Sequence, residues 1–163
     1  MAVSVLFALL QEEGMGNKRM QFLYQQSRLY LISYARGHFV TSSLYCRRIA
    51  EFYVRYAHAD DHPAQNDSLC EAVWALPHWY EKTNDRIGKN EDLSHIAVSL
   101  GMGLSSSSIF DDLTKLRWYG NGGIHVTDQQ LDGYYADPDV FAATIRIIIA
   151  TIALLREVSP AKL

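Results

Sequence analysis

The stretch VFAATIRIIIATIALL, residues 140–155, is a nearly continuous apolar run. It is too short to cross a bilayer comfortably and contains Arg146 near its middle, so a membrane span is not favoured. Asp137 and Pro138 precede it, and proline suits the first turn of a helix because no N–H partner is needed there. We therefore predict a central core helix from about residue 138 to residue 158.

The segment over residues 43–58 has the clearest amphipathic pattern in the chain. Apolar and aromatic side chains recur there at the spacing of one helix face: Tyr45, Ile49, Phe52 and Tyr56. Charged side chains occupy the other sides of the same helix: Arg47, Arg48, Glu51 and Arg55. Hydroxyl groups at residues 41–43 supply N-cap oxygens for it.

Helical periodicity predicts further helices over residues 2–10, 18–36, 69–76, 93–100 and 109–118. Gly37 is in the usual stop position after the second of these, which we expect to pair antiparallel with the helix over 43–58. The glycines at 120–123 are expected to end the helix over 109–118, because glycine readily adopts positive φ. The polar residues 81–90 are expected to form a surface loop.

No segment shows sustained apolar and polar alternation, so strands are not expected. A chain of 163 residues matches one ordinary domain, and a charged fraction of 20% indicates neither disorder nor a membrane bundle. The sequence thus predicts an all-α fold, a single-domain helical bundle over residues 1–163.

The apolar residues 2–10 have no Lys or Arg before them and are followed by two glutamates, which is the wrong frame for a secretory signal. The two cysteines, Cys46 and Cys70, do not imply a disulfide framework and are interpreted as packing residues. We expect a cytoplasmic protein without membrane association.

Charge is unevenly distributed although the net charge is only −3. The first 57 residues carry seven basic side chains against three acidic ones, a balance of +4, and the remainder is acidic. A local positive surface on the early helices is therefore expected, and we assign nucleic-acid binding to Arg47, Arg48 and Arg55, with Glu51 in support.

The segment LRWYGNGGIH, residues 116–125, is the most chemically suggestive part of the chain. The guanidinium of Arg117 can bind phosphate oxygens, the imidazole of His125 titrates near neutral pH, and glycine amides permit close backbone approach. A structural interpretation stays open: Arg117 can pair with Asp112 or Glu51, Asn121 can cap a helix, and His125 can be a packing residue.

The same string resembles the Gly-Asn-x-x-x-His signature of a helical branch of the HEPN superfamily, found in restriction and defence proteins. The run Arg47-Arg48-Ile49-Ala50-Glu51 is similar to the Arg-x-x-Glu helix of that family, and a long apolar helix follows the motif in both. The resemblance implies an HEPN-like portion over about residues 43–158, with the helices over 1–37 packed on it.

In the nuclease members of this superfamily, an arginine and a histidine form a metal-independent RNA-cleaving site, usually completed across a dimer. The resemblance maps His125 onto the family histidine and Asn121 onto the polar residue that follows the family arginine. Gly120 occupies the arginine position itself. Arg117, nearly one helical turn earlier, is the candidate substitute, so the implied catalytic residues are His125, Arg117 and Asn121.

Two functional hypotheses result. The first is an HEPN-like module, a homodimer or a subunit of a larger assembly, that binds RNA or a nucleotide without a cofactor or metal and can act as an endoribonuclease. The second is a protein-interaction module, an inhibitor or accessory subunit, whose interface contains exposed aromatic residues: Trp79, Tyr80, Tyr134 and Tyr135. Weaker candidates are a metal site at residues 58–62 and a stacking platform at His78.

Overall fold

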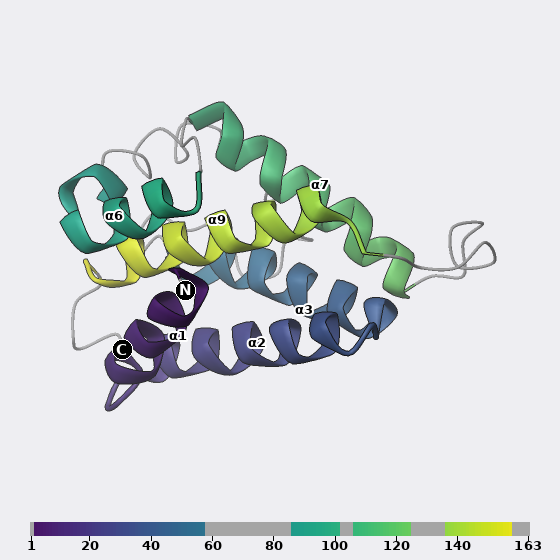
Figure 1. Ribbon diagram of the computed structural model, residues 1–163, viewed down its shortest axis with the longest axis horizontal. Coiled ribbons are helices and arrows are strands. Elements are labelled where there is room, and N and C mark those ends of the chain that lie inside the picture. The colour runs from purple at the N-terminus through teal and green to yellow at the C-terminus, as the bar shows by residue number, and fades with distance from the viewer. Residues whose placement is uncertain (1, 58–85, 102–105, 125–135, 158–163) are drawn as a thin grey trace.

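The computed structural model describes residues 2–57, 86–101, 106–124 and 136–157 (Figure 1). Its helices are α1 (Ala2–Glu13), α2 (Lys18–Ala35), α3 (Phe39–Phe52), the π-helical turn η1 (Tyr53–Ala57), α6 (Glu91–Ser99), α7 (Ser106–Ile124) and α9 (Pro138–Leu155). The described part of the chain contains no strand, which confirms the all-α prediction.

Helix α9 lies between α6 and α7 on one side and α2 and α3 on the other (Figure 1). Asp137 caps it, with Oδ1 accepting from the amides of Asp139 and Val140, and Pro138 occupies its first turn. Its length and composition would suit a membrane span, yet 72% of that window is buried inside the protein. Because nearly all sides of this helix are buried, its sequence is an almost continuous apolar run. The predicted core helix is confirmed.

The charge of Arg146 within this apolar helix is balanced by Asp112 of α7. The guanidinium donates from Nε at 2.6 Å and from Nη2 at 2.8 Å to the two carboxylate oxygens. Burial raises the pKa of Asp112 against the lowering effect of the arginine. Because both charges are partly or wholly removed from water, this bidentate pair fixes α7 against α9.

Helices α2 and α3 pack side by side and are joined by a short turn, as the predicted antiparallel pair requires (Figure 1). Gly37 has a φ of 75°, which closes α2 and lets the chain reverse. The predicted start of α3 was wrong, because the helix begins at Phe39. Ser42 and Ser43 are consequently not caps: both are buried, and their hydroxyls donate to the carbonyls of Phe39 and Val40.

Helix α7 does not end before its glycines but continues through them to Ile124, so the predicted stop at residues 120–123 was wrong. Glycine costs about 1 kcal/mol per position relative to alanine within a helix. Gly120 is buried, and the absence of a side chain there lets α7 pack closely against α3. This packing offsets the cost.

Two other predictions can be judged around α6. Residues 86–89 are helical and Ile87 is buried in the core, so the surface loop expected over 81–90 was wrong in this part. The helix expected over 93–100 is present as α6. Residues 81–85 and the helix expected over 69–76 lie outside the described residues.

Arg156, just after α9, ties three helix ends together. It donates from Nε to Glu13 of α1 at 2.9 Å, from Nη1 to Asn90 at 2.8 Å, and from Nη2 to Asp92 of α6 at 2.8 Å. The hydrogen bond from Arg156 lowers the pKa of the Asp92 carboxyl. This end of the bundle is thus held by charge, whereas its centre is held by apolar packing.

Candidate nucleic-acid interface

The glycine-containing end of α7 lies directly against α3. A Cβ added at Gly120 would overlap the Cβ of Arg47 and lie 3.0 Å from its Cγ and Cδ. The guanidinium of Arg47 extends past this glycine, and its Nη1 donates a hydrogen bond to Oδ1 of Asn121. Arg47, which is distant in sequence, therefore supplies the guanidinium beside Gly120 and Asn121.

Arg117 has a different environment. The residue is 9% exposed, and its guanidinium carbon lies 4.8 Å from the ring centroid of Trp118. Its buried Nη1 atom has no hydrogen-bond partner among the residues that the structure describes. The two partners proposed from sequence are engaged elsewhere, since Asp112 binds Arg146 and Glu51 binds Arg55.

His125, the third residue of the expected catalytic group, lies outside the described residues. The same holds for the other sequence candidates: His58, Asp60, Asp61, His62, Cys70, His78, Trp79, Tyr80, Tyr134 and Tyr135. Cys46 is a buried free cysteine, as expected for a packing residue. Within the described residues, no group of three His, Cys, Asp or Glu side chains could hold a metal ion.

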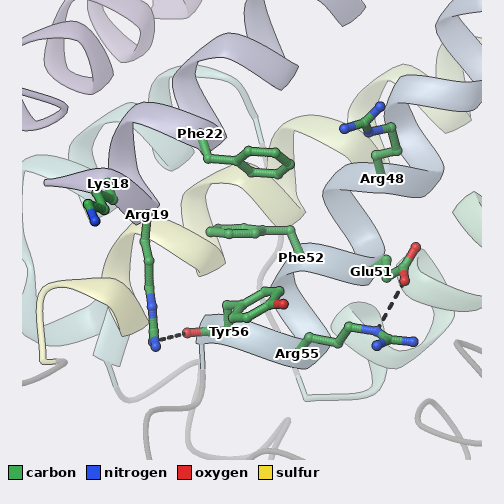
Figure 2. A pocket seen from close by; sticks show the side chains of 8 residues that line it. All are labelled: Lys18, Arg19, Phe22, Arg48, Glu51, Phe52, Arg55 and Tyr56. Atoms are coloured by element: carbon green, nitrogen blue, oxygen red, sulfur yellow. Dashed lines mark hydrogen bonds and ion pairs between the residues drawn. The ribbon is translucent and has the colours of Figure 1, made fainter. Parts of the chain in front are cut away.

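A pocket of about 640 Å³ lies between the start of α2 and the end of α3 with η1 (Figure 2). Its wall is made of cationic and aromatic side chains with one carboxylate: Lys18, Arg19, Phe22, Arg48, Glu51, Phe52, Arg55 and Tyr56. The volume is in the range of small-ligand sites. We call this the cationic pocket.

The rings of Phe22, Phe52 and Tyr56 form a column through the middle of the cationic pocket (Figure 2). Ring centroids are 5.0 Å apart for the first pair and 5.4 Å apart for the second. Phe52 is buried at the centre, whereas Phe22 and Tyr56 are partly exposed. The column thus joins the hydrophobic core to an accessible aromatic surface.

Cations flank this column on both sides. Lys18 and Arg19 approach from α2, and Arg48 and Arg55 approach from α3 and η1 (Figure 2). The guanidinium of Arg48 lies 5.8 Å from the centroid of Phe22, and that of Arg19 lies 5.6 Å from the centroid of Tyr56. Such planar cations extend the stacking surface and keep their positive charge at the pocket.

Four cations against one carboxylate leave the cationic pocket with a net formal charge of +3. Glu51 neutralises Arg55, with an Nε–Oε1 distance of 3.1 Å. Lys18 and Arg48 form no ion pair with any residue in the described ranges. Their charge is available to an anionic ligand.

The location of Lys18 and Arg19 is unfavourable for helix stability alone. They occupy the first turn of α2, which contains no acidic residue. The helix dipole disfavours cations at an N-terminus by about 0.3–1 kcal/mol each. Two cations at a helix start therefore concentrate positive potential, where an anion would be stabilised by both the side chains and the dipole.

The π-helical turn η1 shapes the end of the cationic pocket. It carries Arg55 and Tyr56, and the Tyr56 carbonyl accepts a hydrogen bond from Nη1 of Arg19 at 2.9 Å. A π turn within a helix forfeits regular hydrogen bonding and is frequent at functional sites. Here the hydrogen bond from Arg19 links the start of α2 to η1, which follows α3.

Three of the four residues assigned to nucleic-acid binding and its support line the cationic pocket: Arg48, Arg55 and Glu51. Arg47 lies outside this pocket and binds Asn121. Sequence reasoning missed the contribution of α2: Lys18, Arg19 and Phe22. The signal was present in the spacing, because Phe22 follows the two cations at i+4 and i+3 and shares their helix face. It also treated Phe52 and Tyr56 only as core residues.

Comparisons with protein-family models, with curated proteins and with solved structures gave no match to this chain.

Proposed function

We propose that this protein binds single-stranded RNA or a nucleotide in the cationic pocket. The observation that carries the proposal is the pairing of a +3 charge with partly exposed aromatic and guanidinium planes in one pocket. Phosphates require cations, and bases stack on aromatic rings or on arginine. An acidic protein that concentrates both features on one face fits this ligand class, because its net charge of −3 disfavours unspecific binding elsewhere.

The direct test measures binding of a short fluorescent oligoribonucleotide by anisotropy at several salt concentrations. The variant Lys18→Ala/Arg48→Ala removes two cations that have no ion pair in the described part of the chain, so it should bind about tenfold more weakly or worse. The slope of log K against log salt should fall by about 0.7 for each RNA phosphate that the variant no longer neutralises.

Arg28→Ala/Arg36→Ala is the matched control, because it also removes two cations, and both are exposed residues that do not line the cationic pocket. It should leave affinity and salt slope nearly unchanged. Equal losses in the two variants would mean that net charge, and not the pocket, binds RNA. No binding by the wild-type protein would end the proposal.

The HEPN resemblance extends the proposal to RNA cleavage as a second candidate function. The specific observation in favour is that the guanidinium of Arg47 lies beside Gly120 and Asn121. These two residues precede His125 by five and four positions, where the family arginine and the polar residue after it would stand. In that reaction the ribose 2′-hydroxyl attacks the adjacent phosphorus and gives its proton to a general base of the protein. The 5′-oxygen of the next nucleotide then leaves with a proton from a general acid, and a cyclic phosphate is formed. Arg47 or Arg117 would stabilise the phosphoryl charge, and His125 would transfer the protons.

Purified protein incubated with labelled RNA in chelator tests the second candidate. Cleavage that is lost in His125→Ala and in Arg47→Ala would support it, and intact RNA would refute it. The biological setting belongs to the same proposal: a cytoplasmic, defence-related protein that acts as a homodimer or within a larger assembly. Co-purification of a protein partner without RNA binding would instead favour the interaction module.

A further inference from the structure

A second hollow of about 330 Å³ adjoins the cationic pocket along α3. Its wall consists of Thr41, Leu44, Tyr45, Arg47, Arg48 and Glu51. Arg48 and Glu51 line both hollows, so the two meet at these side chains. The second hollow repeats the chemistry of the first, with one aromatic ring, Tyr45, beside arginine side chains.

The combined length exceeds a single nucleotide. Tyr45 and Tyr56 are 11 residues apart in sequence, which corresponds to about 16 Å along a helix at 1.5 Å per residue. Stacked bases in one strand advance by only about 3.4 Å per nucleotide. A mononucleotide in the cationic pocket would therefore leave the second hollow empty, whereas a short strand would reach it.

We propose that the two hollows form one track for a single strand of RNA, in which Arg48 contacts the phosphate that links a nucleotide in the cationic pocket to the next one. The inference rests on the proposed function and specifies its ligand as an oligonucleotide. Charge complementarity supports this occupant, because cations lie at both ends and at the junction. The track runs toward Arg47 and Asn121, and so toward the end of α7.

Thr41 offers a substitution that blocks the second hollow without harming the fold. Its side chain is exposed and lies in the first turn of α3, where an acidic residue is favoured by the helix dipole. Thr41→Glu places a negative charge in the path of the strand, and Thr41→Gln is the neutral control of the same size. Arg48, the nearest residue of the cationic pocket along α3, is seven residues from Thr41, or about 10 Å along the helix. This exceeds the screening length of about 8 Å at physiological salt, so a mononucleotide in the cationic pocket should sense little of the charge.

Calorimetric titration of the full chain with adenosine 5′-monophosphate and with a hexaadenylate, long enough to span both hollows, separates the possibilities. We expect the hexanucleotide to bind at least tenfold more tightly than the monophosphate. Thr41→Glu should lose at least fivefold of hexanucleotide affinity, while Thr41→Gln and monophosphate binding stay unchanged.

Equal affinity for the two ligands overturns the track while leaving the proposed function intact. Tighter binding of the hexanucleotide that is equal in both Thr41 variants also overturns it, because the strand then avoids the second hollow. If neither ligand binds, the proposed function itself is refuted.

Discussion

Replacing Gly120 by alanine tests the close approach of α7 and α3. The added Cβ would overlap the Cβ of Arg47, an atom fixed to the backbone, so a rotamer change cannot remove the overlap. Overpacking of this kind costs about 1–3 kcal/mol, and alanine regains about 1 kcal/mol of helix propensity. Because the backbones must separate, we place the steric cost near its upper limit and expect a net loss of about 1–2 kcal/mol.

Urea denaturation followed by far-ultraviolet circular dichroism measures this free energy of unfolding. A loss of this size corresponds to a fall in Tm of about 3–6 °C for a chain of this length. Gly88→Ala is the matched control, because Gly88 is helical and exposed, and a Cβ there meets no atom within 4 Å. That variant should be as stable as the wild type or more stable by up to about 1 kcal/mol.

The reasoning would be refuted if Gly120→Ala matched or exceeded the stability of the wild type. Helix propensity would then dominate at both glycines, and the contact with Arg47 would not be close. A further check is Arg47→Ala, which keeps the overlapping Cβ. It should therefore fail to restore stability when combined with Gly120→Ala.

Two other predictions concern charge. Arg146→Ala leaves the buried carboxylate of Asp112 without its partner and should lower the free energy of unfolding, measured in urea, by about 3 kcal/mol. Arg28→Ala, at an exposed position, should lower it by less than about 0.5 kcal/mol. Similar losses in the two variants would contradict the role of the pair. The lowered pKa of Asp92 means that its ion pair with Arg156 stabilises the fold above about pH 4 and is lost as pH falls below this. Asp92→Asn should be less stable than the wild type by under about 1 kcal/mol near neutral pH, and the gap should narrow as pH falls below about 4. A gap independent of pH would refute the linkage.

Among the candidate site residues, Arg48, Glu51 and Arg55 could be grouped from sequence because they share a helix, and neighbouring turns of one helix have fixed relative positions. Their partners on α2 could not be assigned, since the pairing of α2 with α3 determines which of its residues face them. Arg47 shows the same limit. Its hydrogen bond to Asn121 links positions 74 residues apart, and no local pattern records such a distance.

The sequence by itself determined the helical class and the core helix α9, because apolar periodicity and an Asp-Pro start are local properties that hold wherever the helix packs. It could not determine where α7 ends. Local propensity favours a stop at the glycines, but packing of Gly120 against Arg47 outweighs that propensity and extends the helix to Ile124. Tertiary structure alone decided the cationic pocket, since its charge and its aromatic column come from α2 on one side and from α3 with η1 on the other, which meet only when the chain is folded.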